Sequence, residues 1–286
     1  MRDLKVSVLA TIAEIWQLQH QTKVVAYSRV ESDTPLRHNS ALTLEGKLQM
    51  RLYKALQPIH ALSFDLDDTL YPNAAVIAAA ELAMQQQLQQ LLGEVDYNHP
   101  QYWWLQRKLL AQQQPAVRHD VSRWRLLALE QGLQAQGFSS CAAAEMAEVA
   151  MLAFLQARSN IQLPPQVRPI LIALAAKFPL VAITNGNADL NRMGIADLFQ
   201  FAMRAGPDGR MKPYPDMFEK AAQRLQLAPA QILHIGDHHK ADVVGALNAG
   251  CQTCWLNVEP NTPSRLTTLP QLEILQLASL LALPAA

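Results

Sequence analysis

Three aspartates stand within four residues, directly after the short apolar run 61–64: Asp65, Asp67 and Asp68. Clustered carboxylates repel one another unless a cation or a proton relieves the repulsion. An aspartate can also attack a phosphoryl group and form a covalent aspartyl-phosphate. Since side chains two residues apart on an extended chain point the same way, Asp67 can serve as acid and then base for a substrate that Asp65 attacks. The simpler alternative is a solvated acidic turn, because aspartate is common in turns.

Three further polar clusters follow later apolar segments of the chain. They are Thr184-Asn185-Gly186, Lys212-Pro213 and the segment 236–242. Thr184, the cation of Lys212 and backbone N–H groups near Asn185 can hold phosphoryl oxygens. Asp237 offers an oxygen ligand of the kind that Mg²⁺ prefers, and Asp242 can orient Lys212 or a water at the metal. Together with the aspartate cluster, these residues predict a Mg²⁺-dependent site for phosphoryl transfer.

Alternating strand and helix signals predict how these residues are positioned. Buried strands are expected at 61–64, 180–184, 199–203, 232–235 and 253–256. Helices are expected between and after them at 164–177, 188–193, 215–225, 240–249 and 269–283. This alternation is typical of an α/β fold with a doubly wound parallel sheet, a Rossmann-like core. Ligands of such sheets bind beyond the carboxyl ends of the strands, where the polar clusters stand.

A long helical segment interrupts this alternation after the first strand. Residues 74–158 are rich in Ala, Gln, Leu and Glu, which are strong helix formers. Helices are expected there at 74–92, 101–113, 119–136 and 140–157. We therefore expect an inserted α-helical cap domain at 74–163 and a catalytic core made of 50–73 and 164–286.

Residues 1–49 carry none of the motif residues, and the stretch 28–45 shows neither helical nor strand periodicity. We expect an N-terminal extension that is poorly ordered and dispensable for turnover, with Met50 able to serve as a start. The alternative is that a helix at 6–18 docks on the body of the protein through its apolar face.

The composition excludes several classes of function. Lys plus Arg and Asp plus Glu each number 24, so the formal net charge is zero and does not favour nucleic acid or an anionic membrane. The apolar stretch 170–183 is interrupted by Lys177 and Pro179 and is too short to cross a bilayer. Three cysteines fit a reducing compartment. We expect a cytoplasmic protein, a monomer or weak homodimer, whose partner is a small phosphorylated metabolite.

Two other features are compatible with metal or redox chemistry. Cys251 and Cys254 have the spacing of zinc or redox sites, but a zinc site needs about four ligands and only Cys141 remains elsewhere. Three histidines also flank the fourth cluster: His234, His238 and His239. Loop histidines beside a carboxylate are more often solvated or hydrogen-bonded than metal-bound, so Mg²⁺ is the favoured cation.

In their order and on this alternation, the four clusters resemble the signature motifs of the haloacid-dehalogenase-like superfamily of phosphatases. The run Lys212-Pro-Tyr-Pro-Asp-Met-Phe218 resembles the subfamily that carries a helical cap between the first and second motifs. The resemblance spans residues 60–257. It implies that Asp65 is the nucleophile and that Asp67 is the acid and base.

The same resemblance implies the ligands of phosphate and metal. Thr184 and Lys212 would bind the phosphate. Mg²⁺ would be bound by Asp65, Asp237 and the backbone carbonyl of Asp67.

A closer resemblance is to the bacterial phosphatases of flavin biosynthesis that act on 5-amino-6-(5-phospho-D-ribitylamino)uracil. It is carried by Tyr53 and by the segments 61–71, 119–125, 181–187 and 204–207. The resemblance implies this substrate, in riboflavin and FMN biosynthesis. Alternatives are a promiscuous sugar-phosphate or nucleotide phosphatase, or a phosphomutase on the same scaffold. A dehalogenase needs no acid two residues after its nucleophile, so Asp67 argues against it, and a non-enzymatic scaffold would have lost the motif residues.

The catalytic motifs bind only phosphate and metal, so the leaving group must be recognised by the cap. The candidate specificity residues are Arg118, His119, Arg123 and Trp124. A solvated helix start, capped by Asp120, is an equally simple interpretation of that segment. Three neighbouring aromatic residues are expected mostly in the core of the cap, with one ring able to stack on a substrate base: Tyr102, Trp103 and Trp104.

Overall fold

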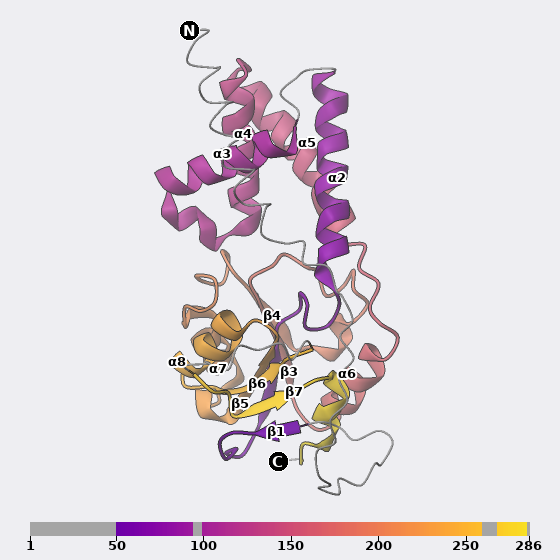
Figure 1. The fold of residues 1–286 in the computed structure, drawn as a ribbon, viewed down its shortest axis with the longest axis vertical. Helices are drawn as coiled ribbons and strands as arrows, with labels where there is room; N and C mark the ends of the chain where they lie inside the picture. The colour runs from indigo at the N-terminus through magenta and orange to yellow at the C-terminus, as the bar shows by residue number, and fades with distance from the viewer. Residues whose placement is uncertain (1–49, 94–98, 259–267, 285–286) are drawn as a thin grey trace, which may run out of the picture. The chain divides into compact units, whose positions relative to one another are not determined.

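The computed structural model describes residues 50–93, 99–258 and 268–284, and one sheet runs through this part of the chain (Figure 1). Its strand order is β1-β7-β6-β5-β2-β3-β4. The strands are β1 (Met50–Leu52), β2 (Ala61–Phe64), β3 (Leu180–Thr184), β4 (Phe201–Arg204), β5 (Ile232–Gly236), β6 (Gln252–Leu256) and β7 (Leu272–Ile274). Strands β2 to β7 pair in parallel, and β1 pairs antiparallel with β7. The expected N-terminal extension 1–49 lies outside the described residues.

Both faces of the sheet are covered, as strands that are apolar on both sides require. The helix α6 (Val167–Ala175) and the 3₁₀ helix η5 (Leu277–Ala282) contribute to one core cluster. The helices α7 (Asp216–Leu225) and α8 (Gly245–Asn248) contribute to another. Along β2, Leu62 and Phe64 belong to the first cluster and Ala61 to the second. The predicted α/β fold with a doubly wound parallel sheet is confirmed.

Strand β2 lies between β3 and β5, so the order of the strands reverses beside it. In the register of the sheet, Phe64 is level with Ala182 on one side and with Ile235 on the other. The carboxyl ends of the three strands therefore meet at one edge of the sheet. Such a reversal point is where open α/β sheets bind ligands.

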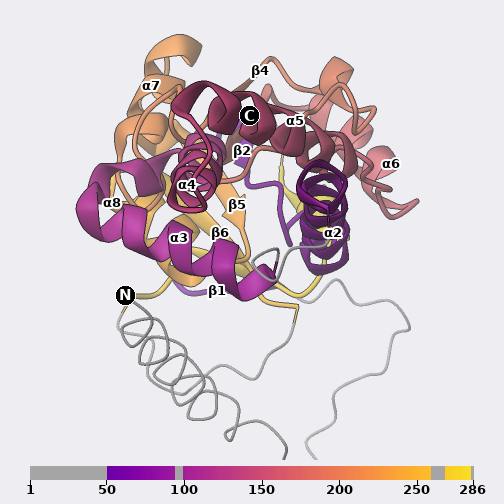
Figure 2. The same cartoon turned by 90° about the horizontal axis from the view of Figure 1, so that it is seen from above.

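Four long helices form a group of their own in the chain between β2 and β3 (Figure 1). They are α2 (Asn73–Leu92), α3 (Pro100–Gln113), α4 (Val121–Ala135) and α5 (Ser140–Arg158), with the 3₁₀ helix η1 (Pro115–His119) before α4. In the view from above, α4 lies between α3 and α5, and α5 runs beside α2 (Figure 2). The inserted helical cap is thus confirmed, whereas its exact limits at 74 and 163 stay a prediction.

Among the described helices, α5 is the one that is long and apolar enough to cross a membrane, with 19 residues and a mean hydropathy of 1.2 over 18 of them. One face of α5, which includes Ala147 and Phe154, is buried in the core cluster of the cap. Val149 and Leu152 remain exposed. The apolar character of α5 is therefore used in part for packing against the other cap helices.

Two of the expected helices are wrong. Residues 188–189 are irregular and 190–194 form turns, and Asp189 Oδ1 accepts hydrogen bonds from the backbone N–H groups of Asn191 and Arg192. A side chain that bonds the backbone in this way competes with helix formation. The closing helix expected at 269–283 is instead the strand β7 followed by η5. Its leucine-rich sequence suits a helix, but pairing with β6 and β1 decides its conformation.

The helix expected at 240–249 is divided. Residues His239–Val244 form a π-helical turn, η4, and α8 follows at Gly245. A Cβ atom at Gly245 would lie 2.8 Å from the Cα atom of Pro213, so only glycine allows these two segments to approach so closely. This contact brings the chain after Lys212 against the chain after β5.

We predict that Leu280→Ala lowers the free energy of unfolding by about 2–5 kcal/mol, because Leu280 is fully buried against the sheet. Leu281→Ala is the matched control, since Leu281 lies next to it in η5 and is exposed. We expect a change below about 1 kcal/mol there. Denaturant unfolding of both variants measures the difference, and equal losses would mean that η5 does not pack as described.

Candidate active site

Asp65 follows directly after β2 and is 8% exposed. Its backbone N–H donates to the carbonyl oxygen of Ile235 at 2.9 Å, which extends the pairing of β2 with β5 by one residue. Its Oδ1 accepts a hydrogen bond from Lys212 Nζ at 2.8 Å. The sheet and the lysine together fix both the backbone and the carboxylate of Asp65.

The ammonium group of Lys212 is buried and has three acceptors. Besides Asp65, they are the carbonyl oxygen of Ile183 at 2.6 Å and Asp242 Oδ1 at 2.7 Å. Since a lysine has three N–H donors, each donor has a partner. The side chain of Asn185 holds the backbone of Lys212: Asn185 Oδ1 accepts from its N–H at 2.6 Å and Asn185 Nδ2 donates to its carbonyl at 3.0 Å. Asn185 therefore positions the loop that carries the lysine.

Asp242 is the second carboxylate that contacts Lys212, and it is also buried. Its Oδ1 lies 3.3 Å from His234 Nε2, and its Oδ2 accepts from the backbone N–H of His238 at 2.9 Å. The other ring nitrogen of His234 lies 2.9 Å from Ser63 Oγ. Because both oxygens of Asp242 already accept hydrogen bonds, this carboxylate fits a role in orienting Lys212.

The burial of these groups changes their protonation. Burial raises the pKa of Asp65 to about 7, although Lys212 acts in the opposite direction. Burial alone would lower the pKa of Lys212, but Asp242 and Asp65 outweigh it and raise the pKa. Burial likewise opposes the ionised form of Asp242, yet Lys212 holds its pKa well below the usual range. Burial lowers the pKa of His234 to about 4, so the imidazole is neutral at pH 7 and its contact with Asp242 is a hydrogen bond.

Asp67 is held by two side chains that donate to the same oxygen. Arg158 Nη2 donates to Asp67 Oδ1 at 2.5 Å, and the hydroxyl of Tyr71 makes a short hydrogen bond to that oxygen. Arg158 Nη1 also donates to the Tyr71 hydroxyl oxygen at 2.9 Å. Burial and the neighbouring Asp67 raise the pKa of Tyr71 above its usual value, so the phenol keeps its proton. Asp67 thus stands beside Asp65 but binds a different cation.

The loop after β3 lies against Asp67. Thr184 is fully buried and its Oγ1 accepts from the backbone N–H of Gly186 at 3.0 Å. A Cβ atom at Gly186 would overlap Asp67 Oδ2, so this approach requires glycine. The structure therefore brings together the predicted residues Asp65, Asp67, Thr184 and Lys212.

The carboxylates that follow β2 and β5 fit a magnesium ion. One oxygen each of Asp65, Asp237 and Asp242 lies within 4.8 Å of the others. Of the three, Asp242 is already engaged as described, which leaves Asp65 and Asp237 as oxygen ligands for a hard cation. Asp237 Oδ1 accepts from Thr69 Oγ1 at 2.8 Å, and burial raises the pKa of Asp237. A divalent cation would relieve the cost of keeping both carboxylates ionised in a buried site.

A family model described as haloacid dehalogenase-like hydrolase matches residues 59–250. The chain belongs to the haloacid dehalogenase-like hydrolases. The 5-amino-6-(5-phospho-D-ribitylamino)uracil phosphatase YigB of Escherichia coli strain K12 is 42% identical over 246 residues, which cover 82% of this chain and the whole of that protein. A glyceraldehyde 3-phosphate phosphatase of Methanopyrus kandleri is 28% identical over 221 residues, 68% of this chain and 82% of that protein.

A solved structure described as 2-haloacid dehalogenase from Pseudomonas syringae pv. Tomato DC3000 has a TM-score of 0.73 at 36% identity and covers 78% of this chain and 96% of that one. The fold and the family found from the sequence motifs are thus confirmed for this haloacid dehalogenase-like hydrolase.

The turn before α4 joins the cap of this hydrolase to its core. The ring of His119 lies edge-on to the ring of Tyr214, with centroids 5.1 Å apart. Asn187 Nδ2 donates to Ser122 Oγ at 3.0 Å, and Gly206 lies directly against the side chain of Asp120. These contacts involve the loops after β3, β4 and Lys212. The turn therefore contacts the core, and the expected helix cap is also present, because Asp120 Oδ1 accepts from the backbone N–H groups of Ser122 and Arg123 at 3.1 and 2.9 Å.

The other predicted specificity residues lie on the same segment. Arg118 and Arg123 are exposed. Arg123 lines a cavity between the start of α4 and the loops after β3 and β4. The indole N–H of Trp124 donates to the carbonyl oxygen of Arg107 at 2.8 Å. Their role in specificity stays a prediction.

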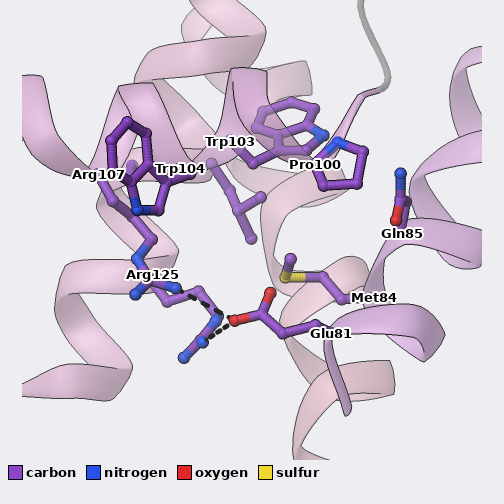
Figure 3. A pocket seen from close by; sticks show the side chains of 10 residues that line it. Glu81, Met84, Gln85, Pro100, Trp103, Trp104, Arg107 and Arg125 are labelled. Atoms are coloured by element: carbon purple, nitrogen blue, oxygen red, sulfur yellow. Dashed lines mark hydrogen bonds and ion pairs between the residues drawn. The ribbon is translucent and has the colours of Figure 1, made fainter. Parts of the chain in front are cut away.

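A cavity of about 270 Å³ lies within the cap between α2, α3 and α4 (Figure 3). Glu81 stands at its charged end, where it pairs with Arg107 at 3.2 Å and with Arg125 at shorter range. Trp103 and Trp104 line the cavity from α3. None of the four predicted specificity residues lines this cavity.

Tyr71 and Arg158, which hold Asp67, are residues of this site that motif reasoning missed. Tyr71 stands within the segment 61–71, but its hydroxyl has no fixed role in a strand-end motif. Arg158 lies 91 residues from Asp67 in the sequence, at the end of a helix. A lone arginine at the end of an alanine-rich helix reads as a solvated or helix-capping residue. Only the folded cap brings it to the carboxylate.

We predict that wild-type protein loses stability relative to His234→Gln as the pH falls from about 6.5 towards 4. In the folded state His234 stays neutral until about pH 4, whereas the unfolded chain binds a proton near pH 6.5. The unfolded state therefore binds more protons in this window, and acid favours unfolding by about 1.4 kcal/mol per pH unit at most. Glutamine does not titrate, so the difference between the two unfolding free energies isolates this group. A difference that is independent of pH would contradict the assignment of a neutral buried imidazole.

Proposed function

We propose that the chain is a Mg²⁺-dependent phosphatase that hydrolyses a small phosphorylated metabolite through an aspartyl-phosphate. The observation that carries this proposal is the pair Asp65 and Asp67, one held by Lys212 and the other by Arg158. Two neighbouring carboxylates with separate partners suit two different tasks, nucleophile and proton donor. The similarity over the whole length of a curated phosphatase supports the same reaction class.

The proposed reaction has two steps. Asp65 attacks phosphorus through a carboxylate oxygen, the bond from phosphorus to the leaving oxygen breaks, and that oxygen takes a proton from Asp67. Asp67 then takes a proton from a water molecule, which attacks the phosphorus of the aspartyl-phosphate and releases inorganic phosphate with Asp65 restored.

Thr184 and the backbone N–H groups after Thr184 would bind the phosphoryl oxygens, and the positive charge of Lys212 would stabilise their negative charge. Mg²⁺, held by Asp65, Asp237 and the backbone carbonyl of Asp67, would neutralise the phosphate and the clustered carboxylates. Asp242 would act by orienting the lysine.

A dehalogenase is the main alternative from a different reaction class, because a structural relative carries that description. A dehalogenase also uses an aspartate nucleophile, but its leaving halide needs no proton. Asp67, placed against Gly186 with one oxygen held by two donors, is a feature that a phosphatase requires and a dehalogenase does not. The site therefore favours phosphoryl transfer.

The proposed substrate is 5-amino-6-(5-phospho-D-ribitylamino)uracil, in a cytoplasmic riboflavin pathway. The support is the 42% identity with the Escherichia coli enzyme, which covers that enzyme completely. A promiscuous sugar-phosphate or nucleotide phosphatase, and a phosphomutase, remain the alternatives. Release of inorganic phosphate separates the phosphatases from the mutase, which forms an isomer instead.

The cap cavity is our candidate for recognising the leaving group. Arg125, at its charged end, stacks over the ring of Phe154 at 3.8 Å. Phe154 lies one helical turn before Arg158, which binds Asp67. Burial lowers the pKa of Arg125, and Arg158 is close enough to contribute to this shift. The tryptophan rings of α3 suit a planar ring, and the charged groups suit the polar edge of a pyrimidine.

We predict that Asp65→Asn loses more than about 99% of phosphate release, because an amide cannot form the covalent intermediate. Asp68→Asn is the matched control: Asp68 is exposed, accepts a hydrogen bond from the backbone of Asn73, and is outside the proposed machinery. It should keep most of the activity. The measurement is phosphate release over a panel of metabolite phosphates, with and without Mg²⁺. Turnover by Asp65→Asn above a few per cent of wild type would refute the mechanism.

We predict that Arg107→Gln raises KM for the ribitylaminouracil phosphate about tenfold or more and leaves KM for p-nitrophenyl phosphate nearly unchanged. Arg107 lines the cavity and pairs with Glu81. Arg118→Gln serves as the matched comparison, since Arg118 is also a cap arginine but lies outside the cavity. The opposite pattern, an effect at Arg118 only, would favour the segment 118–124 as the specificity element.

A further inference from the structure

Arg158 is a buried cation that the catalytic motifs do not include. It is the last residue of α5, and its side chain is 1% exposed. Taking a guanidinium out of water costs several kcal/mol unless partners compensate. Its Nη1 and Nη2 donate to Tyr71 and Asp67, whereas its buried Nε has no hydrogen-bond partner in the described residues. The contacts with these two residues therefore supply the compensation.

The three side chains form a closed ring of directed hydrogen bonds. The oxygen of Tyr71 accepts from Arg158, so its own hydrogen is directed to Asp67 Oδ1. Asp67 Oδ1 thus receives two donors. Asp67 Oδ2 lies on the other side, against Gly186 and the loop that carries Thr184. The ring distinguishes the two oxygens of one carboxylate and turns Oδ2 towards the other catalytic residues.

We propose that Arg158 is a positioning residue: with Tyr71 it fixes Oδ1 of Asp67, so that Oδ2 is the atom that exchanges the proton with the leaving group and with water. This inference rests on the proposed function. The proton moves from Oδ2 to the leaving oxygen as the bond from that oxygen to phosphorus breaks. Arg158 itself touches neither the substrate nor the reacting atoms in this scheme.

The contact between Arg158 and Asp67 joins the cap to the segment after β2. Arg158 belongs to the cap, whereas Asp67 and Tyr71 precede α2. The orientation of the proton donor therefore depends on the cap being docked as in this structure. The contacts of the turn before α4 with Tyr214 and Asn187 hold the same docked arrangement.

Leaving groups of different basicity test this role. An alkyl phosphate needs a proton on its leaving oxygen, whereas p-nitrophenolate leaves without one. We expect Arg158→Ala to lower kcat/KM about 10–100-fold for ribose 5-phosphate or the ribitylaminouracil phosphate, less than the roughly 100–10,000-fold that loss of a general acid itself costs, and less than about threefold for p-nitrophenyl phosphate. Because kcat/KM reports events up to the first irreversible step, the later attack of water does not mask the comparison. Equal losses on both substrates would overturn the proposal.

A double-mutant cycle separates positioning from general structural support. In the Asp67→Asn background, Arg158→Ala should change kcat/KM for the alkyl phosphate less than about twofold, because residues that act as one unit are not additive. A full additional loss in that background would mean that Arg158 acts elsewhere. Arg168→Ala is the matched control, since Arg168 pairs with Asp197 at the surface of the core. It should behave as wild type on both substrates.

Two more conservative variants test the same positioning role if Arg158→Ala does not fold. Tyr71→Phe removes only the hydroxyl of the ring, and Arg158→Lys keeps the cation but not the planar fork that reaches two acceptors. Both should show the same dependence on the leaving group, and no such dependence in either would overturn the proposal. A wild type that releases no phosphate, or an Asp67→Asn variant with unchanged kcat/KM, would instead refute the proposed function itself.

Discussion

The ammonium group of Lys212, buried between Asp65 and Asp242, is the interaction on which the rest of the site depends. Two carboxylates at adjacent strand ends would repel each other in a buried site, and the lysine compensates both at once. Removing one member of such a group leaves an uncompensated charge, which typically costs about 3–5 kcal/mol. The loop held by Asn185 and the close packing of Gly245 on Pro213 both serve to keep the lysine in this position.

Asp242 connects the buried lysine to polar residues inside the sheet. Asp242 also contacts His234, whose other nitrogen lies next to Ser63 in β2. These contacts run from Asp242 through His234 in β5 to Ser63 in the neighbouring strand β2, where Ser63 is level with His234. A neutral imidazole can link a carboxylate to a hydroxyl without adding a further buried charge. The arrangement explains why two polar residues occupy positions inside otherwise apolar strands.

The sequence predicts the core of the site well because that information is local. Each strand is an apolar run, each polar cluster directly follows one, and the order of parallel strands brings their ends together. The closing segment 269–283 and the residues Tyr71 and Arg158 are different. β7 is a strand because β6 and β1 pair with it, and Arg158 meets Asp67 because the cap docks. Neither the pairing nor the docking leaves a periodicity or a spacing that can be found along the chain.

The two aspartates of the first motif therefore differ in what determines their orientation. Asp65 is held by Lys212, a residue of the core, and by the backbone of β5, so it keeps its orientation whatever the cap does. Asp67 is held by Arg158, a residue of the cap. The proposed nucleophile is thus held by groups of the core, whereas the orientation of the proposed proton donor depends on a residue of the docked cap. Under the proposed function, such a division would make proton transfer, rather than attack on phosphorus, the step that requires the docked cap.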